Sequence, residues 1–199
     1  MVDLMFKQTA KRTVRLIALA AILPIYFLFL LASVISSKDQ AFAGFSQFMS
    51  LFPGKSGSYL RAAFYKLAMQ NCPEDVTICF GSIFSQQQTQ LASGIYIGPQ
   101  CNIGKCHIEK NCLLGSGVHI MSGKGQHNFS DIDTPIQEQG GTFEAISIGE
   151  DCWIGNGSLI MANVGKKCVI GAGSVVINDI PDYSIAAGNP AKVIKHRKQ

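Results

Sequence analysis

Aliphatic residues recur every six positions in the C-terminal two thirds of the chain, beginning at about Val76. Neither a helix nor an ordinary strand has a six-residue period. A coil of three short strands does, because each side turns one aliphatic side chain inward and places a small residue at the corner. The pattern therefore predicts a mainly β fold, a parallel β-helix of triangular cross-section, with about five coils stacked over roughly 24 Å. The repeated positions are Ile97, Ile103, Ile108, Leu114, Ile120, Ile148, Ile154, Ile160, Ile170 and Val176.

The period is interrupted by a polar, glycine-rich segment, residues 121–145, which contains no hexapeptide. This segment has to leave the coils as a long loop, and loops of that length in a compact fold are usually functional. A second irregularity lies between Ile160 and Ile170, where the coil is two residues short of the expected twelve. Prolines then end the coils, so residues 179–199 are expected to form a C-terminal tail.

A different pattern occupies the N-terminal region, where residues 16–37 are uncharged and almost entirely apolar. A straight helix of this length would run roughly 33 Å, which is enough to cross a bilayer. A cleaved signal peptide fits poorly, because the apolar run exceeds the usual hydrophobic region. Pro24 divides the run. Two arrangements therefore stay open, a kinked span and a helical hairpin that returns to its own side of the membrane.

Two amphipathic helices are predicted next, over residues 41–52 and 58–70. Apolar side chains recur in each at spacings of three and four, as on one helical face. In the second helix, Arg61 and Lys66 are expected to meet water or phosphate. These helices either pack on the body of the protein or lie in a membrane interface, and the pattern alone favours neither.

The charge distribution separates residues 1–70 from residues 71–199. The first region has eight basic and two acidic residues, whereas the second has nine basic and eleven acidic ones. Positive charge beside apolar sequence fits anionic lipid headgroups, and no basic and aromatic stripe points to nucleic acid. We therefore expect a membrane-associated helical region at 1–70, followed by the β-helix at 71–199.

The seven cysteines are an odd number and include no CxxC pair, which indicates reduced thiols in a cytosolic compartment. Cys101, Cys112, Cys152 and Cys168 each follow an aliphatic residue by four positions. Such a position suits a small inward side chain, so these cysteines are expected to pack in the core rather than to bind metal.

Three motifs in order, WIG at 153–155, IGAGSVV at 170–176 and AGNPAKVI at 187–194, resemble the hexapeptide-repeat acyltransferases. These are left-handed β-helix enzymes, and the resemblance covers roughly residues 76–195. The segment SGKGQH and the short coil MANVG look most similar to the polysaccharide O-acetyltransferase branch. The resemblance implies a homotrimer, with acetyl-CoA as the acyl donor in the groove between neighbouring prisms.

The same resemblance places the catalytic histidine at His127, in the loop. A sugar hydroxyl is a poor nucleophile, and its attack on a thioester needs a base with a pKa near neutral. His107 and His119 fall within the coils, where a packing role is expected. The group that orients His127 is undetermined. The acidic residues of the loop are Asp131, Asp133, Glu138 and Glu144, and a backbone carbonyl could also serve.

Further site residues follow from the resemblance. Trp153 matches a tryptophan near the acceptor. The positions that match contacts to CoA, with the pantetheine arm first and the phosphates last, are Asn156, Ala172, Gly173, Lys192 and Lys195. For Trp153 and the two lysines, a purely structural or solvated role fits the sequence equally well.

The predicted function is a membrane-associated O-acetyltransferase that moves acetyl from acetyl-CoA to a sugar hydroxyl. Its acceptor is expected to be a polysaccharide, an exopolysaccharide or capsule precursor, or a lipid-linked glycan; no metal or nucleic acid is expected. Because CoA is cytosolic, the catalytic domain is placed on the cytosolic side of the inner (cytoplasmic) membrane. Two alternatives are a β-helix metalloenzyme of the carbonic anhydrase type, which needs three clustered histidines, and a non-catalytic membrane scaffold.

Overall fold

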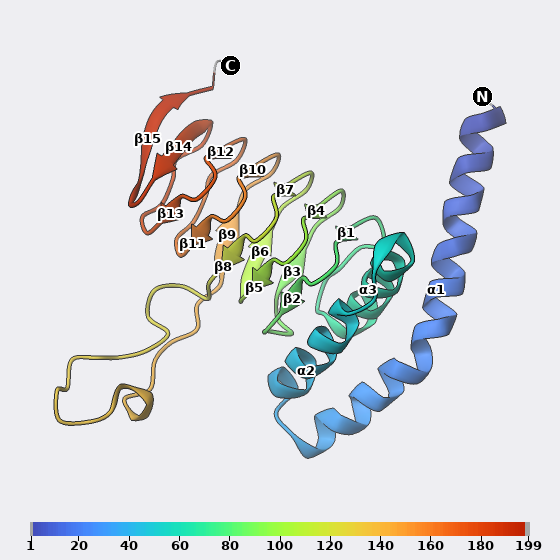
Figure 1. The fold of residues 1–199 in the computed structure, drawn as a ribbon, viewed down its shortest axis with the longest axis horizontal. Coiled ribbons are helices and arrows are strands. Elements are labelled where there is room, and N and C mark those ends of the chain that lie inside the picture. Colours follow the sequence, from blue (N-terminus) through green and yellow to red (C-terminus); the bar gives the residue numbers. More distant parts are fainter. Residues whose placement is uncertain (1, 198–199) are drawn as a thin grey trace.

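The computed structural model describes residues 2–197 and consists of a helical end and a prism of short strands, with one long loop leaving the prism (Figure 1). The helices are α1 (Val2–Ile35), α2 (Lys38–Ser50) and α3 (Gly54–Ala68). Ser37 begins α2 as its N-cap, where its side chain accepts a hydrogen bond from the Gln40 backbone N–H. The amphipathic helices predicted at 41–52 and 58–70 are thus present, with each beginning three to four residues earlier than expected.

The prism has three faces, each a sheet of stacked strands that are mostly two residues long. The first face has the order β1-β4-β7-β10-β12-β14-β15, the second β2-β5-β8-β11-β13 and the third β3-β6-β9. All neighbours pair in parallel except β14 and β15, so the chain passes through the three faces in turn, as in the predicted β-helix. The strands are β1 (Thr77–Ile78), β2 (Ile83–Phe84), β3 (Gln90–Leu91), β4 (Tyr96–Ile97), β5 (Asn102–Ile103), β6 (Cys106–Ile108), β7 (Leu113–Leu114), β8 (His119–Ile120), β9 (Ile146–Ile148), β10 (Trp153–Ile154), β11 (Leu159–Ile160), β12 (Val169–Ile170), β13 (Val175–Val176), β14 (Ser184–Gly188) and β15 (Ala191–His196).

The core of the prism consists of the periodic aliphatic residues, which are all buried. In the two-residue strands the second residue points inward and the first outward. The cysteines behave as predicted. Cys152 and Cys168 are buried and donate weak hydrogen bonds to the carbonyls of Gly165 at 3.0 Å and Pro181 at 3.1 Å. These thiols therefore act as small packing groups that also satisfy turn carbonyls.

Helices α2 and α3 close the first end of the prism, so the reading in which they pack on the protein body is the one found. Phe42 and Tyr65 are buried, and the Tyr65 ring lies 4.7 Å from that of Phe84 on β2. Buried Ser46 links the same elements, since its hydroxyl lies 2.7 Å from the Tyr65 hydroxyl and accepts a hydrogen bond from the Phe84 N–H. Burial raises the pKa of Tyr65 well above its usual range, which keeps this hydroxyl neutral.

Arg61 on α3 is fully buried, so the expectation that it meets water or phosphate is wrong. Its guanidinium donates hydrogen bonds to the carbonyls of Ile78 at 2.9 Å, Met49 at 3.3 Å and Phe52 at 2.6 Å. Met49 and Phe52 lie at the C-terminal end of α2, where free carbonyls and the helix dipole attract a cation. Arg61 thereby ties α2, α3 and β1 together.

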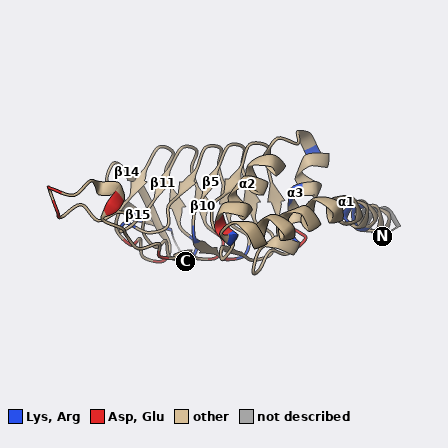
Figure 2. Cartoon of the chain, turned by 90° about the horizontal axis from the view of Figure 1, so that it is seen from below, with Lys and Arg blue, Asp and Glu red and all other residues tan. Residues whose placement is uncertain are grey.

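Helix α1 is continuous through Pro24, so the hairpin at this proline is not present. The chain instead reverses after Ile35, between α1 and α2 (Figure 1). One stripe of α1, including Ala18, Ile22 and Phe29, is buried against the other helices. The opposite side exposes large apolar side chains. The segment Gln8–Ile35 is long and apolar enough to cross a membrane, with a mean hydropathy of 2.5, and basic residues mark its N-terminal part (Figure 2).

The region expected as a tail at 179–199 is more ordered than its prolines suggest. β14 pairs in parallel with β12 and adds a further strand to the first face, and β15 then folds back antiparallel to β14. A cis peptide bond joins Asn189 and Pro190 in the turn between them. At the second end of the prism, the first face therefore finishes with an antiparallel strand.

Candidate active site

The predicted loop at 121–145 leaves the prism between β8 and β9, at the corner where the second face meets the third. Its two arms run side by side, held by hydrogen bonds from Thr142 N–H to the Gly125 carbonyl at 2.7 Å and from Asn128 N–H to the Gly140 carbonyl at 2.9 Å. A 3₁₀ helix, Ile136–Glu138, lies near its far end. The loop is thus an extended arm that reaches away from its own prism (Figure 1).

His127 lies on this arm between the two backbone pairings, and its side chain is exposed. Within residues 2–197 its imidazole forms no hydrogen bond. Gly141 lies opposite, where an added Cβ would collide with the backbone of Gln126, so the close approach of the two arms requires glycine. Asp131 does not orient the histidine in this chain, because its carboxylate accepts hydrogen bonds from the Thr134 hydroxyl and the Asp133 N–H, which lower its pKa.

Three of the predicted CoA contacts, Asn156, Ala172 and Gly173, are brought together at the corner between the first and second faces. The Gly173 N–H donates to the Asn156 carbonyl at 2.8 Å, so the two turns are directly stacked. The Asn156 side-chain oxygen accepts a hydrogen bond from the Ser116 N–H of the coil below at 3.2 Å. The asparagine amide thereby joins successive turns and leaves the outer side of the corner open.

Two further residues, Gly117 and Gly157, extend this corner and were not predicted from the sequence. Gly117, Gly157 and Gly173 have φ values of 66°, 67° and 68°. At the corner between the third and first faces, the equivalent positive φ is held by ordinary side chains, such as Asn111 at 62° and Asp151 at 55°. Backbone strain alone therefore does not demand glycine in this fold. We call Gly117, Asn156, Gly157, Ala172 and Gly173 the glycine strip.

The glycine strip is bare because nothing lies within 4 Å of a Cβ added at Gly157 or Gly173. A ligand can therefore approach the backbone closely along successive coils. The signal in the sequence is the glycine that recurs at this corner after β7, β10 and β12, whereas Gln100 holds the equivalent place after β4 with a φ of 59°. This geometry suits a long, thin ligand such as the pantetheine arm of CoA.

Trp153 and the two lysines lie on the first face, which adjoins this strip. Trp153 is on β10, 56% exposed, with Leu113 and Val169 as its neighbours across the strands of the first face. Lys192 and Lys195 are exposed on β15. Lys192 pairs with Ala187 across β14 and β15. Ala187 in turn lies against Gly171, since a Cβ added at Gly171 would be 2.8 Å from the Ala187 Cβ. Lys192 therefore lies beside the C-terminal end of the glycine strip.

A single chain does not assemble the whole predicted site. His127 is at the corner of the second and third faces, whereas the glycine strip is at the corner of the first and second. The second face separates the two. His119 is exposed on β8, so its expected packing role in the core is wrong; it precedes the inward residue Ile120 and faces outward. Across residues 2–197, no group of three or more metal-binding side chains comes together within the chain.

Comparisons with known proteins support the fold and the repeat. Residues 145–177 match the family described as hexapeptide repeat of succinyl-transferase. A probable acetyltransferase of Mycobacterium tuberculosis is 45% identical over 74 residues, which make up 36% of this chain and 25% of that protein. The chain thus matches about a quarter of the length of this curated relative.

Solved structures similar to this chain include a maltose O-acetyltransferase from Clostridium difficile 630. Its TM-score is 0.69, with 20% identity over 82% of this chain and 90% of that chain. The N-acyltransferase AntD from Bacillus cereus has a TM-score of 0.53 and 22% identity, over 62% and 70% of the two chains. At these identities the likeness concerns the fold. Residues 145–177 carry the hexapeptide repeat, and the parallel sheets of the chain fit the left-handed β-helix of the acyltransferases. The resemblance indicated by the sequence motifs is confirmed.

Proposed function

We propose that this protein is an acetyl-CoA-dependent O-acetyltransferase whose acceptor is a sugar hydroxyl of a polysaccharide precursor or lipid-linked glycan. The observation that carries the proposal is the bare glycine strip, which offers backbone instead of side chains to a long ligand, at Gly157 and Gly173 above all. The names of two similar structures support a CoA thioester as the donor and a sugar as the acceptor. One is a maltose O-acetyltransferase, and another was solved in complex with dTDP and 3-hydroxybutyryl-CoA.

His127 is the proposed general base. Its ring nitrogen accepts the proton of the sugar hydroxyl, and the hydroxyl oxygen then attacks the carbonyl carbon of the thioester. The carbon–sulfur bond breaks, acetyl passes to the oxygen, and the CoA thiolate leaves with the proton from the imidazolium. An exposed imidazole free of internal hydrogen bonds is available for this exchange, since no partner within residues 2–197 fixes its tautomer.

The protein is proposed to act as a homotrimer, because each half of the site needs a partner. In a cyclic assembly, the arm of one chain can approach the glycine strip of its neighbour. The arm carries exposed apolar side chains that favour such contact, with Phe129 at 76% and Ile132 at 94% exposure. Lys192 and Lys195, both exposed on β15, are proposed to bind the phosphates of CoA, and exposed Trp153 is proposed to contact the acceptor.

We also propose that the protein is attached to the cytosolic face of the inner membrane. The exposed apolar side of α1, which includes Ile17, Leu23 and Leu31, is suited to lie in the lipid interface. The packing argues against a span, because the other side of α1 packs along α2 and α3. The apolar part of α1 packs on α2 through Phe29 and Phe42, so a crossing α1 would carry α2 and its charged residues, such as Asp39, into the hydrocarbon. In-plane attachment keeps both the catalytic domain and its acetyl-CoA in the cytosol.

The experiment that tests the proposed function is the substitution His127→Ala, assayed with labelled acetyl-CoA and a membrane extract, followed by identification of the labelled product. Loss of a positioned base typically lowers the rate ~10²- to 10⁴-fold. Stability should change by no more than about 0.5 kcal/mol, because the side chain is exposed and leaves no cavity.

His119→Ala is the matched control, since His119 is also an exposed histidine but lies on β8. This variant should keep near-normal turnover. If His127→Ala retains turnover at saturating acceptor, or if only His119 proves essential, the proposed site is incorrect.

A further inference from the structure

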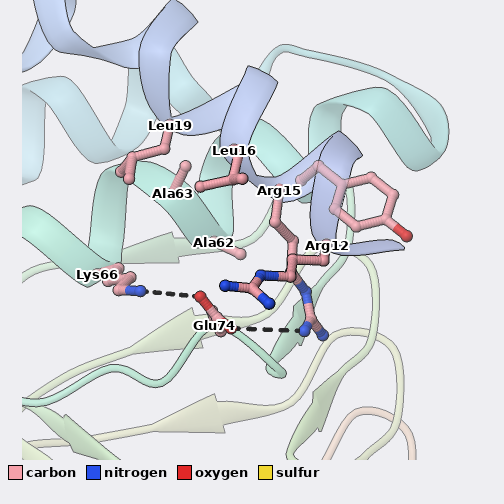
Figure 3. A pocket seen from close by; sticks show the side chains of 9 residues that line it. Arg12, Arg15, Leu16, Leu19, Ala62, Ala63, Lys66 and Glu74 are labelled. Atoms are coloured by element: carbon pink, nitrogen blue, oxygen red, sulfur yellow. Dashed lines mark hydrogen bonds and ion pairs between the residues drawn. The ribbon is translucent and has the colours of Figure 1, made fainter. Parts of the chain in front are cut away.

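A basic pocket lies between α1 and α3, away from the candidate active site. We call it the basic pocket and define its charged lining as Arg12, Arg15, Lys66 and Glu74 (Figure 3). Its volume is about 200 Å³, which is enough for a phosphate group. The basic residues come from two different helices and point toward one opening. The packing of α1 on α3 therefore creates this cluster, which neither helix could form alone.

Positive charge in the basic pocket exceeds what the protein itself neutralises. Glu74 pairs with Lys66 at 2.9 Å and with Arg15 at 3.8 Å. The Lys66 hydrogen bond and charge, together with Arg15 and Arg12, lower the pKa of Glu74, so the carboxylate stays ionised at neutral pH. One carboxylate thus faces three cations. Arg12 forms no ion pair within residues 2–197, which leaves its fork of donors free for an anion.

Arg15 presents a second unused donor. Its Nε is buried and has no hydrogen-bond partner among the residues that the structure describes. A buried donor without a partner is unfavourable unless a ligand supplies an acceptor. A phosphate oxygen is suited to this, because guanidinium groups bind phosphate through paired donors. The geometry therefore favours an oxyanion over a neutral ligand.

The walls of the basic pocket are apolar. Leu16, Leu19, Ala62 and Ala63 line its inner side. Leu16 is also 59% exposed and begins the outer apolar surface of α1. A ligand held by the cations therefore meets hydrocarbon on one side immediately. A free inorganic phosphate would leave these walls unused, whereas a phosphate ester with a lipid chain would cover them.

A larger pocket of about 650 Å³ adjoins the basic pocket and shares Arg15, Tyr59 and Glu74 with it. It adds Lys55 and extends to Tyr96 on the first face of the prism. Tyr96 pairs with Leu113, which pairs in turn with Trp153, so exposed side chains run along this face toward the proposed acceptor site. A headgroup attached to the phosphate therefore fits in this larger pocket and can extend along the first face toward Trp153.

We infer that the basic pocket binds the phosphate of a lipid, with the lipid chain along the outer side of α1 and the attached headgroup in the larger pocket. Two sources share this chemistry, a phospholipid of the bilayer and the lipid phosphate of a glycan acceptor. The site rests on the proposed membrane attachment. It does not depend on acetyl transfer, so it can be tested by binding alone.

The test uses the full chain in mild detergent and titrates farnesyl phosphate, farnesol, inorganic phosphate and short-chain phosphatidylglycerol by calorimetry. Farnesyl phosphate should bind more tightly than either farnesol or inorganic phosphate, because it engages the cations and the apolar wall together. Arg12→Gln should weaken binding about tenfold. Glu74 remains paired in this variant, so the fold is preserved.

Lys38→Gln is the matched control, because Lys38 is an exposed cation at the start of α2 that does not line the pocket. Its affinity should stay within about twofold of the original protein. Equal weakening by both substitutions, or equal binding of farnesyl phosphate and farnesol, would overturn the inference. Competition between phosphatidylglycerol and farnesyl phosphate identifies a general lipid-phosphate site, and absence of phosphatidylglycerol binding identifies a prenyl carrier. His127→Ala should bind like the original protein, which separates this site from the proposed reaction.

Discussion

Replacement of Arg61 by alanine should separate the helical end from the prism. The side chain is fully buried, and its hydrogen bonds reach the carbonyls of Met49, Phe52 and Ile78, at the end of α2 and in β1. Burial lowers the pKa of this guanidinium because desolvation disfavours its charge. The three acceptors offset that cost. Alanine would leave all three carbonyls without this donor and open a cavity at the junction.

The expected loss can be worked from these contacts. A hydrogen bond to a charged group contributes about 1.5–3 kcal/mol, so the three contacts together exceed ~4 kcal/mol before any offset. Removal of the cation also removes its desolvation penalty, which returns part of this sum. We therefore expect Arg61→Ala to reduce the free energy of unfolding by about 3–5 kcal/mol. Arg61→Lys should recover part of the loss, since an ammonium can serve some of the carbonyls but lacks the fork of the guanidinium.

Urea unfolding provides the assay with two independent signals. Circular dichroism at the helical minimum reports the helices, and fluorescence reports the prism because Trp153, on β10, is the single tryptophan. The helical transition should move to lower urea in Arg61→Ala. Lys55→Ala, at an exposed lysine on the same helix, should change stability by less than about 0.5 kcal/mol. A loss below 1 kcal/mol in Arg61→Ala would refute the assigned role of this side chain.

Two further predictions concern assembly and thiol reactivity. Mixed trimers of His127→Ala and Ala172→Trp should recover part of the activity that each variant lacks alone, because some interfaces then combine an intact arm with an intact glycine strip; an absence of recovery after subunit exchange would contradict a shared site. In the native protein, a thiol reagent should modify Cys79 first, since it is partly exposed and the other six cysteines are buried. Burial raises the pKa of Cys72 to about 12, so its thiolate is scarce at neutral pH, and mass spectrometry that finds Cys72 modified first would contradict this order.

The prism could be predicted from the sequence because each side of a coil carries one inward residue. Ile103 and Ile154 are two of these inward residues. Their six-residue spacing fits neither a helix nor an ordinary strand, so it indicates a coil. The loop with His127 was found for the same reason, since the period stops there. His119 could have been assigned to the outer surface, because it directly precedes the inward Ile120 in a two-residue strand.

The remaining features depend on contacts between distant segments. A charged residue on an amphipathic helix is normally expected to face water, and only the carbonyls supplied by α2 and β1 make the burial of Arg61 favourable. The basic pocket likewise needs α1 to pack on α3, which the apolar run of 16–37 does not indicate. The meaning of Gly157 needed its φ value and its corner. The complete site could not be assembled from one chain, because the arm with His127 is expected to meet the glycine strip of another chain.

The covered end of the prism bears on how this protein can be handled. A parallel β-helix leaves a row of unpaired backbone groups at each end, and such edges recruit further strands. Here α2 and α3 cover one end, whereas at the other end the first face finishes with the antiparallel strand β15. The helices on which the membrane-attached α1 packs are therefore also the cover of this end of the prism. Removal of the N-terminal helices to obtain a soluble enzyme would expose unpaired strand edges and yield filaments. Detergent solubilisation of the intact chain is therefore the better route.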